Sequence, residues 1–154
     1  MTRVLMVCTG NICRSLMAHA VLDQRAREAG VDIVVDSAGV SDEEAGNRPD
    51  PRAQRVLREH GYEVPDHRAR QVRAEDFADF DLILAMTDTH LARLQRLHRR
   101  AGAAADVTIA LYRDWDPDGT GQVPDPWYGD YSDFIDTLEC IERVTPRLLE
   151  DLRA

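Results

Sequence analysis

The sequence lacks any long run of apolar residues. In its 154 residues, no apolar stretch approaches the roughly 18 residues that a membrane-spanning helix needs. The first residues, Met1–Val7, are too short for the apolar region of a signal peptide, and no small-residue cleavage site follows them. We therefore expect no membrane association and a cytoplasmic location.

Lysine is absent, and the chain has no excess of basic residues. All 19 basic residues are arginines, which we attribute to a compositional bias of the coding genome. The formal net charge is −9, whereas the phosphate backbone of nucleic acids is bound by basic surfaces. The charge balance therefore argues against a nucleic-acid partner.

Cysteine is scarce, with Cys8, Cys13 and Cys140 as the only three. Three cysteines do not make the disulfide framework of a small secreted protein. The first two are separated by four residues, which is not the usual spacing of a zinc-binding pair, and no second pair completes a site. We expect no metal, and we place Cys140 in the core.

Four apolar segments alternate with helical patterns. The composition, 44% hydrophobic and 31% charged, is that of an ordinary globular protein. The pattern predicts one domain over residues 1–154, a three-layer α/β fold with a four-stranded parallel sheet flanked by helices. The strands are predicted at Arg3–Val7, Val31–Asp36, Leu82–Met86 and Val107–Leu111, and the helices at Ser15–Ala29, from Asp50-Pro51 to near Gly61, at Thr89–Arg100, and from near Ser132 onward, with Pro146 kinking or restarting the last one.

The stretch CTGNICRS, residues 8–15, joins the first strand to the first helix. Ligands of open α/β sheets bind beyond the carboxyl ends of strands. Backbone N–H groups and a helix N-terminus favour an anion there, and Arg14 adds a planar fork for phosphate or arsenate oxygens. Gly10 and Asn11 tolerate left-handed backbone. Cys8 is expected to be a nucleophilic thiolate, and Ser15 to cap the helix or donate to the sulfur.

A thiolate that attacks a phosphoester also needs an acid for the leaving oxygen. Three aspartates that precede proline are candidates, namely Asp50, Asp116 and Asp125. Asp50 is explained as a helix cap, and Asp116, in DPDG, as a plain turn. Asp125 lies after the fourth strand and precedes two aromatic residues, Trp127 and Tyr128, that can grip a flat substrate. We favour Asp125.

Six segments, in order and over nearly the whole chain, resemble the low-molecular-weight protein tyrosine phosphatases. Their sequences are CTGNICRS, DSAG, DPRA, DHRARQV, EDFADFDLILAM and DPWYGDYSDF, of which the first and last are the most specific. The resemblance implies a phosphocysteine intermediate, no metal and no cofactor, and a phosphotyrosyl protein as substrate. We expect a monomer or a weak homodimer.

The resemblance assigns roles to individual residues. Cys8 matches the nucleophile, Arg14 the phosphate-binding arginine and Asp125 the general acid that later activates water. Cys13 matches a second cysteine that can form a disulfide with an oxidised nucleophile. The expected phosphate-binding loop comprises Thr9, Gly10, Asn11, Ile12, Cys13, Arg14 and Ser15, with Ser37 and His67 joining Asn11 and Ser15 in a supporting hydrogen-bonded set, and Trp127 and Tyr128 in the substrate cleft.

The chain also departs from the family pattern. Leu16 stands where the family usually has proline. Thr87 and His90 stand where many members have aspartate and asparagine, which puts support of the loop from that side in doubt. The variable loop lacks an aromatic wall and carries Asp42, Glu43 and Glu44 instead. We expect a more open, acidic cleft that disfavours acidic phosphopeptides.

Other functions on similar scaffolds stay open. An arsenate reductase needs further cysteines after the third strand, where the chain has none before Cys140. Protein arginine phosphatases resemble this chain throughout but have threonine at the position of Ile12, which favours phosphotyrosine here. A phosphocarrier has no use for an acid such as Asp125, and the intact set of Cys8, Arg14 and Asp125 argues against an inactive phosphate-binding module.

Overall fold

The computed structural model describes residues 1–102 and 106–153. The four strands are β1 (Thr2–Cys8), β2 (Ile33–Gly39), β3 (Leu82–Ala85) and β4 (Thr108–Leu111). They form one parallel sheet in the order β2-β1-β3-β4. The predicted four-stranded parallel sheet is confirmed.

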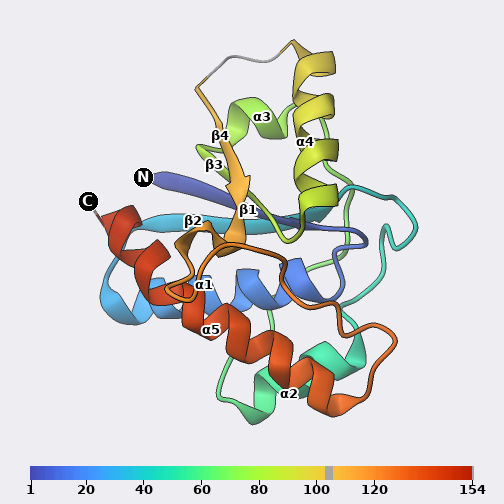
Figure 1. The fold of residues 1–154 in the computed structure, drawn as a ribbon, viewed down its shortest axis with the longest axis vertical. Helices are drawn as coiled ribbons and strands as arrows, with labels where there is room; N and C mark the ends of the chain where they lie inside the picture. The colour runs from blue at the N-terminus through green and yellow to red at the C-terminus, as the bar shows by residue number, and fades with distance from the viewer. Residues whose placement is uncertain (103–105, 154) are drawn as a thin grey trace.

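Helices cover both faces of this sheet (Figure 1). The helices α1 (Arg14–Ala29), α2 (Pro51–Glu59) and α5 (Tyr131–Arg153) lie on one side, and α3 (Asp76–Asp79) and α4 (Asp88–Ala101) lie on the other. Side chains of β1 alternate between two cores: Val4 and Met6 face the first group of helices, and Leu5 and Val7 face the second. A strand buried on both faces explains the continuous apolar run in the sequence.

Several boundaries differ from the sequence prediction. Strand β2 begins two residues later than expected and continues to Gly39, because Ser37, Ala38 and Gly39 pair with the end of β1. The short helix α3 and a 3-10 helix, η1 (Tyr112–Trp115), were not predicted. Helix α5 does not restart at Pro146 but continues through it. Cys140 is buried in the core, as expected.

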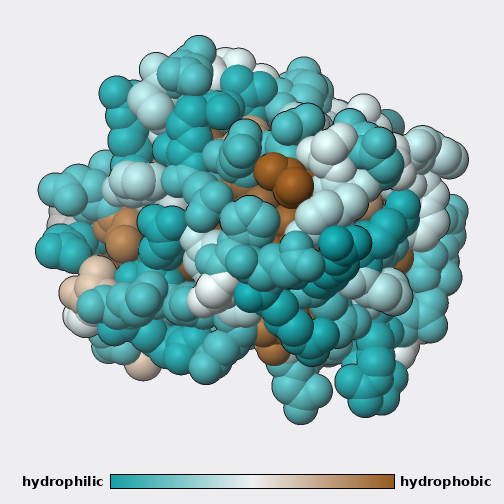
Figure 2. All heavy atoms as spheres, turned by 90° about the horizontal axis from the view of Figure 1, so that it is seen from below, coloured by the Kyte–Doolittle hydropathy of each residue, from teal (hydrophilic) through white to brown (hydrophobic). Residues whose placement is uncertain are grey.

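One face of the molecule is mostly polar. The face seen from below in Figure 1, where α2 and α5 lie, is largely hydrophilic, with apolar atoms in small separate patches (Figure 2). None of the described helices is long and apolar enough to cross a membrane.

Candidate active site

The segment between β1 and α1 lies where the strand order reverses. Strand β1 ends at Cys8 and α1 begins at Arg14, and β2 and β3 flank β1 on opposite sides. This is the switch point at which open α/β sheets bind ligands. Gly39 of β2 pairs with Cys8, and a Cβ on Gly39 would stand 2.5 Å from the carbonyl oxygen of Thr9. Only glycine allows β2 to approach the loop this closely.

The backbone of residues 8–13, here called the phosphate loop, directs three of its carbonyl groups to neighbouring segments. The Cys8 and Thr9 carbonyls accept hydrogen bonds from Val40 and Ser41 at 2.9 and 3.0 Å, and the Ile12 carbonyl accepts one from Asp50 at 3.0 Å. Within the described part of the chain, the N–H groups of residues 9–13 donate no hydrogen bond. Such a set of N–H groups at a helix N-terminus is suited to bind an anion.

The left-handed backbone expected in this loop occurs at one residue. Asn11 has φ 65°, whereas Gly10 does not adopt a positive φ. The reason for glycine at position 10 is instead the space available, because a Cβ there would stand 3.0 Å from Cγ of Glu44.

A chain of hydrogen bonds links Cys8 to the interior. The Cys8 sulfur lies 3.0 Å from Oγ of Ser15, and Asn11 donates to the same oxygen at 3.0 Å. Oδ1 of Asn11 lies 2.7 Å from Nε2 of His67, which is 3.3 Å from Oγ of Ser37. The structure therefore brings the four expected supporting residues together. Ser15 contacts the sulfur but makes no capping bond to the helix.

Sequence reasoning missed one member of this network. His19 of α1 lies 2.9 Å from Oγ of Ser37 through Nδ1 and is 8% exposed. Burial, and then the neighbouring His67, lower the pKa of His19 to about 4. A polar residue within the apolar stretch LMAHAV was the available signal.

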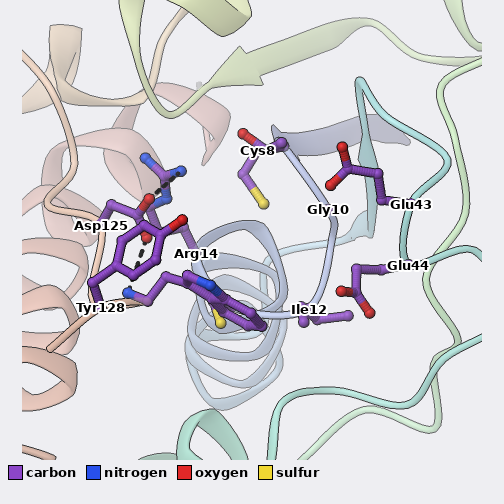
Figure 3. Close-up of a pocket in the computed structure, with 11 residues that line it drawn as sticks. Cys8, Gly10, Ile12, Arg14, Glu43, Glu44, Asp125 and Tyr128 are labelled. Atoms are coloured by element: carbon purple, nitrogen blue, oxygen red, sulfur yellow. Dashed lines mark hydrogen bonds and ion pairs between the residues drawn. The ribbon is translucent and has the colours of Figure 1, made fainter. Parts of the chain in front are cut away.

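A cleft of about 230 Å³ opens above the phosphate loop (Figure 3). Cys8, Arg14 and Asp125 all line it, together with Ile12, Trp127 and Tyr128. The buried guanidinium of Arg14 pairs with the carboxylate of Asp125 at 3.4 Å, and the Asp125 side chain is 49% exposed. Two segments distant in sequence, residues 8–14 and the segment of Asp125, thus supply one nucleophilic, one cationic and one acidic group to the same cavity.

The segment that carries Asp125 is held by contacts to α2 and α5. Asp125 accepts a hydrogen bond from the backbone N–H of Trp127 at 3.1 Å, and Thr137 donates to the Pro124 carbonyl at 3.0 Å. Arg52 lies over the Trp127 ring at 5.3 Å and donates to its carbonyl at 3.1 Å. Sequence reasoning did not assign this role to Arg52, although DPRA was part of the resemblance.

The other two aspartates that precede proline behave differently from each other. Asp50 caps α2, as predicted, by accepting from the Arg52 N–H at 2.7 Å. Asp116 opens the predicted turn, since its carbonyl accepts from the N–H of Gly119 at 3.0 Å, but its side chain has a second role. It is 4% exposed and pairs with Arg113 and Arg143, each at 2.8 Å, so it joins η1 to α5. Arg113 lies three residues before Asp116, but Arg143 lies 27 residues after it, and this distant partner concealed the role.

The phosphate loop is supported from the side of α4. The presence of Thr87 and His90 in place of the family's aspartate and asparagine had put this support in doubt. Nε2 of His90 lies 2.8 Å from Oγ1 of Thr9, and His90 is 3% exposed. Thr87 caps α4 by accepting from the N–H of His90 at 3.3 Å. Burial, and then the charge of Arg14, lower the pKa of His90 to about 4, so its ring is neutral near pH 7.

Two acidic residues form the wall opposite Asp125. Glu43 and Glu44 line the cleft, and Figure 3 shows them across it from Asp125 and Tyr128. Glu44 accepts a hydrogen bond from Asn47 at 2.6 Å, which holds it in place. Asp42 is exposed and does not line the cleft. The expectation of an acidic cleft therefore applies to two of the three acidic residues.

The fold and the site define a class: a parallel α/β protein with a cysteine and an arginine in an anion-binding loop after its first strand. The family model described as low molecular weight phosphotyrosine protein phosphatase matches residues 3–154. A low molecular weight protein-tyrosine-phosphatase of Streptomyces coelicolor is 43% identical over 156 residues, covering 98% of this chain and 93% of the relative. The chain belongs to the low-molecular-weight protein tyrosine phosphatase family.

Solved structures agree with this assignment. A protein tyrosine phosphatase from Entamoeba histolytica superposes with a TM-score of 0.89 at 30% identity, covering 99% of this chain and 97% of that one. A Drosophila arginine phosphatase superposes with a TM-score of 0.92, also at 30% identity, covering 100% and 99%. The scaffold is therefore shared by enzymes named for two different phosphorylated residues.

Proposed function

We propose that this protein hydrolyses phosphotyrosine in proteins, and small aryl phosphates, through a phosphocysteine intermediate. The observation that carries the proposal is the convergence of Cys8, Arg14 and Asp125 on one cleft. The cleft also has Trp127 and Tyr128, 39% and 94% exposed, as aromatic surfaces for a phenyl ring.

The first step transfers the phosphoryl group to Cys8. The thiolate attacks phosphorus as the bond to the phenolic oxygen breaks, and Asp125 gives its proton to that oxygen. Arg14 and the N–H groups of the phosphate loop bind the three equatorial oxygens, where charge accumulates in the transition state. The hydrogen bond from Ser15 favours the thiolate and stabilises it as a leaving group later.

The second step releases inorganic phosphate. Asp125, now a carboxylate, takes a proton from water, whose oxygen attacks phosphorus as the bond to sulfur breaks. The thiolate of Cys8 is restored. In the free protein Arg14 pairs with Asp125, so substrate phosphate must displace this contact when it binds.

The proposal is tested by hydrolysis of an aryl phosphate and a phosphotyrosyl peptide by the metal-free full-length protein. Cys8→Ser should abolish turnover, and Asp125→Asn should lower kcat by about 10²- to 10⁴-fold. Asp130→Asn is the matched control, because Asp130 is exposed, does not line the cleft and caps the following turn. Full activity of Cys8→Ser would contradict the mechanism.

Cys13 is proposed as the protecting partner of Cys8. Both are free thiols, and burial, followed by the charge of Asp50, raises the pKa of the Cys13 thiol. A sulfenic acid formed on Cys8 by peroxide can condense with the Cys13 thiol, releasing water and forming a disulfide.

Free buried thiols also support the proposal that the protein acts in the cytoplasm. We propose a monomer or weak homodimer as the acting form.

The acidic wall of the cleft is proposed to select the peptide around the phosphotyrosine. The carboxylates of Glu43 and Glu44 should repel acidic neighbours and attract basic ones. We expect wild type to favour a basic over an acidic phosphotyrosyl peptide in kcat/KM, and Glu43→Gln with Glu44→Gln to reduce this preference. Asp42→Asn, a change of charge outside the cleft, should leave the preference unaltered. Equal rates on both peptides in wild type would contradict the proposal.

Phosphoarginine is the second candidate substrate. The likeness to the Drosophila arginine phosphatase and the two carboxylates beside the cleft, which suit a guanidinium, favour it. Ile12, 8% exposed at the cleft, favours the phenyl ring of phosphotyrosine instead. We expect a higher kcat/KM on a phosphotyrosyl than on a phosphoarginyl peptide, with the ratio reduced in Ile12→Thr. A higher value on phosphoarginine would reverse the assignment.

A further inference from the structure

Two histidines and an aspartate meet behind the phosphate loop. His19 comes from α1, Asp36 from β2, and His67 from the segment after α2. One ring nitrogen of each histidine and one carboxylate oxygen of Asp36 all lie within 4.8 Å of one another. None of the three lines the catalytic cleft. Among the described residues, these three side chains form the group whose ligand atoms lie close enough together to hold a metal ion.

Two of the three ligand atoms already have the separation of a metal site. Nδ1 of His67 lies 3.5 Å from Oδ1 of Asp36. In a tetrahedral zinc site with bonds of about 2.0–2.1 Å, neighbouring ligand atoms are about 3.4 Å apart. His19 and His67 meet edge to face with ring centroids 5.4 Å apart, and the His19 nitrogen, within 4.8 Å of the other two ligand atoms, moves toward them when a metal binds.

Both histidines are ready to act as neutral ligands. Metal binding requires deprotonated ligands, and burial lowers the pKa of both rings, to about 4 for His19. With the metal on Nδ1, His67 carries its proton on Nε2 and donates it to Asn11 at 2.7 Å. A metal-bound histidine usually donates its second N–H in this way.

The surroundings of Asp36 leave one oxygen for a metal. Its Oδ2 lies 3.3 Å from the guanidinium of Arg70, and Oδ1 faces His67 and also accepts the Ser37 N–H at 2.8 Å. The charge of Arg70 is offset by Asp76, which binds it at 3.0 Å. The side chains of His67 and Asp36 are 11% and 33% exposed, which leaves a path for an ion and a position for water.

We propose that His19, Asp36 and His67 bind one transition-metal ion, with Zn²⁺ as the ion that best fits two imidazoles and one carboxylate. Nitrogen donors disfavour Mg²⁺ and Ca²⁺. The site departs from the sequence-based expectation of no metal, which rested on the spacing of the cysteines and on the family resemblance. The ion holds His67 in the tautomer that donates to Asn11, and therefore supports the chain of hydrogen bonds from Asn11 through Ser15 to Cys8.

The test must separate this site from the active-site cysteine, because a thiolate is itself a good zinc ligand. Zn²⁺ is titrated by calorimetry into the full-length protein after treatment with a chelator, in wild type and in Cys8→Ser. One equivalent should bind in Cys8→Ser, because the proposed ligands include no sulfur, and any further equivalent that wild type binds through Cys8 should be absent from this variant. Co²⁺ added to Cys8→Ser should show absorption bands of nitrogen and oxygen ligation without a thiolate-to-cobalt band. Loss of binding in Cys8→Ser, or a thiolate band, would overturn the proposal.

Matched variants test the ligands themselves. His19→Gln and Asp36→Asn, each made in the Cys8→Ser background, should weaken Zn²⁺ binding roughly tenfold or more. His60→Gln is the control, because His60 is exposed and contacts the carbonyl of Val56 in its own helix. Zn²⁺ should also raise the melting temperature of Cys8→Ser and of the control, but not of the two ligand variants. Undiminished affinity in both ligand variants would refute the site.

Discussion

His90 joins the phosphate loop through one ring nitrogen and buries the other. Its Nε2 meets the hydroxyl of Thr9, whereas Nδ1 has no hydrogen-bond partner among the described residues. A buried imidazole beside the guanidinium of Arg14 is costly to protonate. At the scale of single residues, His90 therefore links the stability of the protein to pH.

This link gives a prediction with a definite sign. The pKa of His90 falls from 6.5 in the unfolded chain to about 4 in the folded protein, so the unfolded state binds more protons between these values. The contribution of neutral His90 to the free energy of unfolding is complete above pH 6.5 and is lost as the pH falls toward 4. Between pH 7 and 4.5, wild type should lose about 2 kcal/mol more than His90→Asn in urea unfolding. Equal losses would show that His90 does not titrate as described.

At the scale of elements, the end of β2 shapes the phosphate loop. Strand β2 extends to Gly39, and the carbonyl of Thr9 occupies the space that a side chain at position 39 would need. The DSAG motif thus places a glycine where backbone meets backbone. At Gly10, by contrast, the obstacle is the flexible side chain of Glu44.

The two glycines should differ in their response to alanine. Gly39→Ala forces strand and loop apart, so we expect a loss of about 1–3 kcal/mol in the free energy of unfolding together with a reduced affinity for inorganic phosphate. Gly10→Ala requires only that Glu44 move, and should cost less in stability. Urea unfolding and phosphate titration of the two variants measure both effects. A larger loss of stability in Gly10→Ala would contradict this explanation of the motif.

At the scale of the whole molecule, Asp116 ties the edge of the sheet to the C-terminal helix. Its buried carboxylate binds Arg113 of η1 and Arg143 of α5, and Arg143 in particular holds the pKa of Asp116 well below its usual range. Asp116→Asn should destabilise the fold by about 2 kcal/mol, because two charges lose their partner. Asp118→Asn removes the exposed partner of Arg143 and should change stability by less than about 0.5 kcal/mol. Thermal or urea unfolding distinguishes the two variants. Equal losses of stability would contradict the role of Asp116 in joining η1 to α5.

Much of this architecture was predictable from the sequence, for physical reasons. Apolar β-branched runs and helix stop signals located four strands and the main helices, and the phosphate loop followed from residue types between a strand and a helix. The resemblance to a family placed Ser37 and His67 beside Asn11, as the structure confirms. Local patterns were sufficient for these features.

The features that escaped prediction depend on contacts between distant segments. His19, Arg52 and Asp116 act through partners 18 or more residues away, and no local pattern shows such pairing. The support that His90 gives to Thr9 was doubted because a histidine replaced the expected asparagine, although its imidazole nitrogen reaches the hydroxyl of Thr9. The proposed metal site combines three segments in the same way.

The central claim is that Cys8 carries the phosphoryl group during turnover. Rapid quenching of the full-length protein mixed with an aryl phosphate, followed by mass spectrometry of the intact chain and its peptides, tests it most directly. The account predicts one phosphoryl group on Cys8 within the first turnover, and its disappearance once the substrate is consumed. Hydrolysis without any phosphorylated Cys8, or a phosphorylated Cys8 that persists after the substrate is gone, would contradict it.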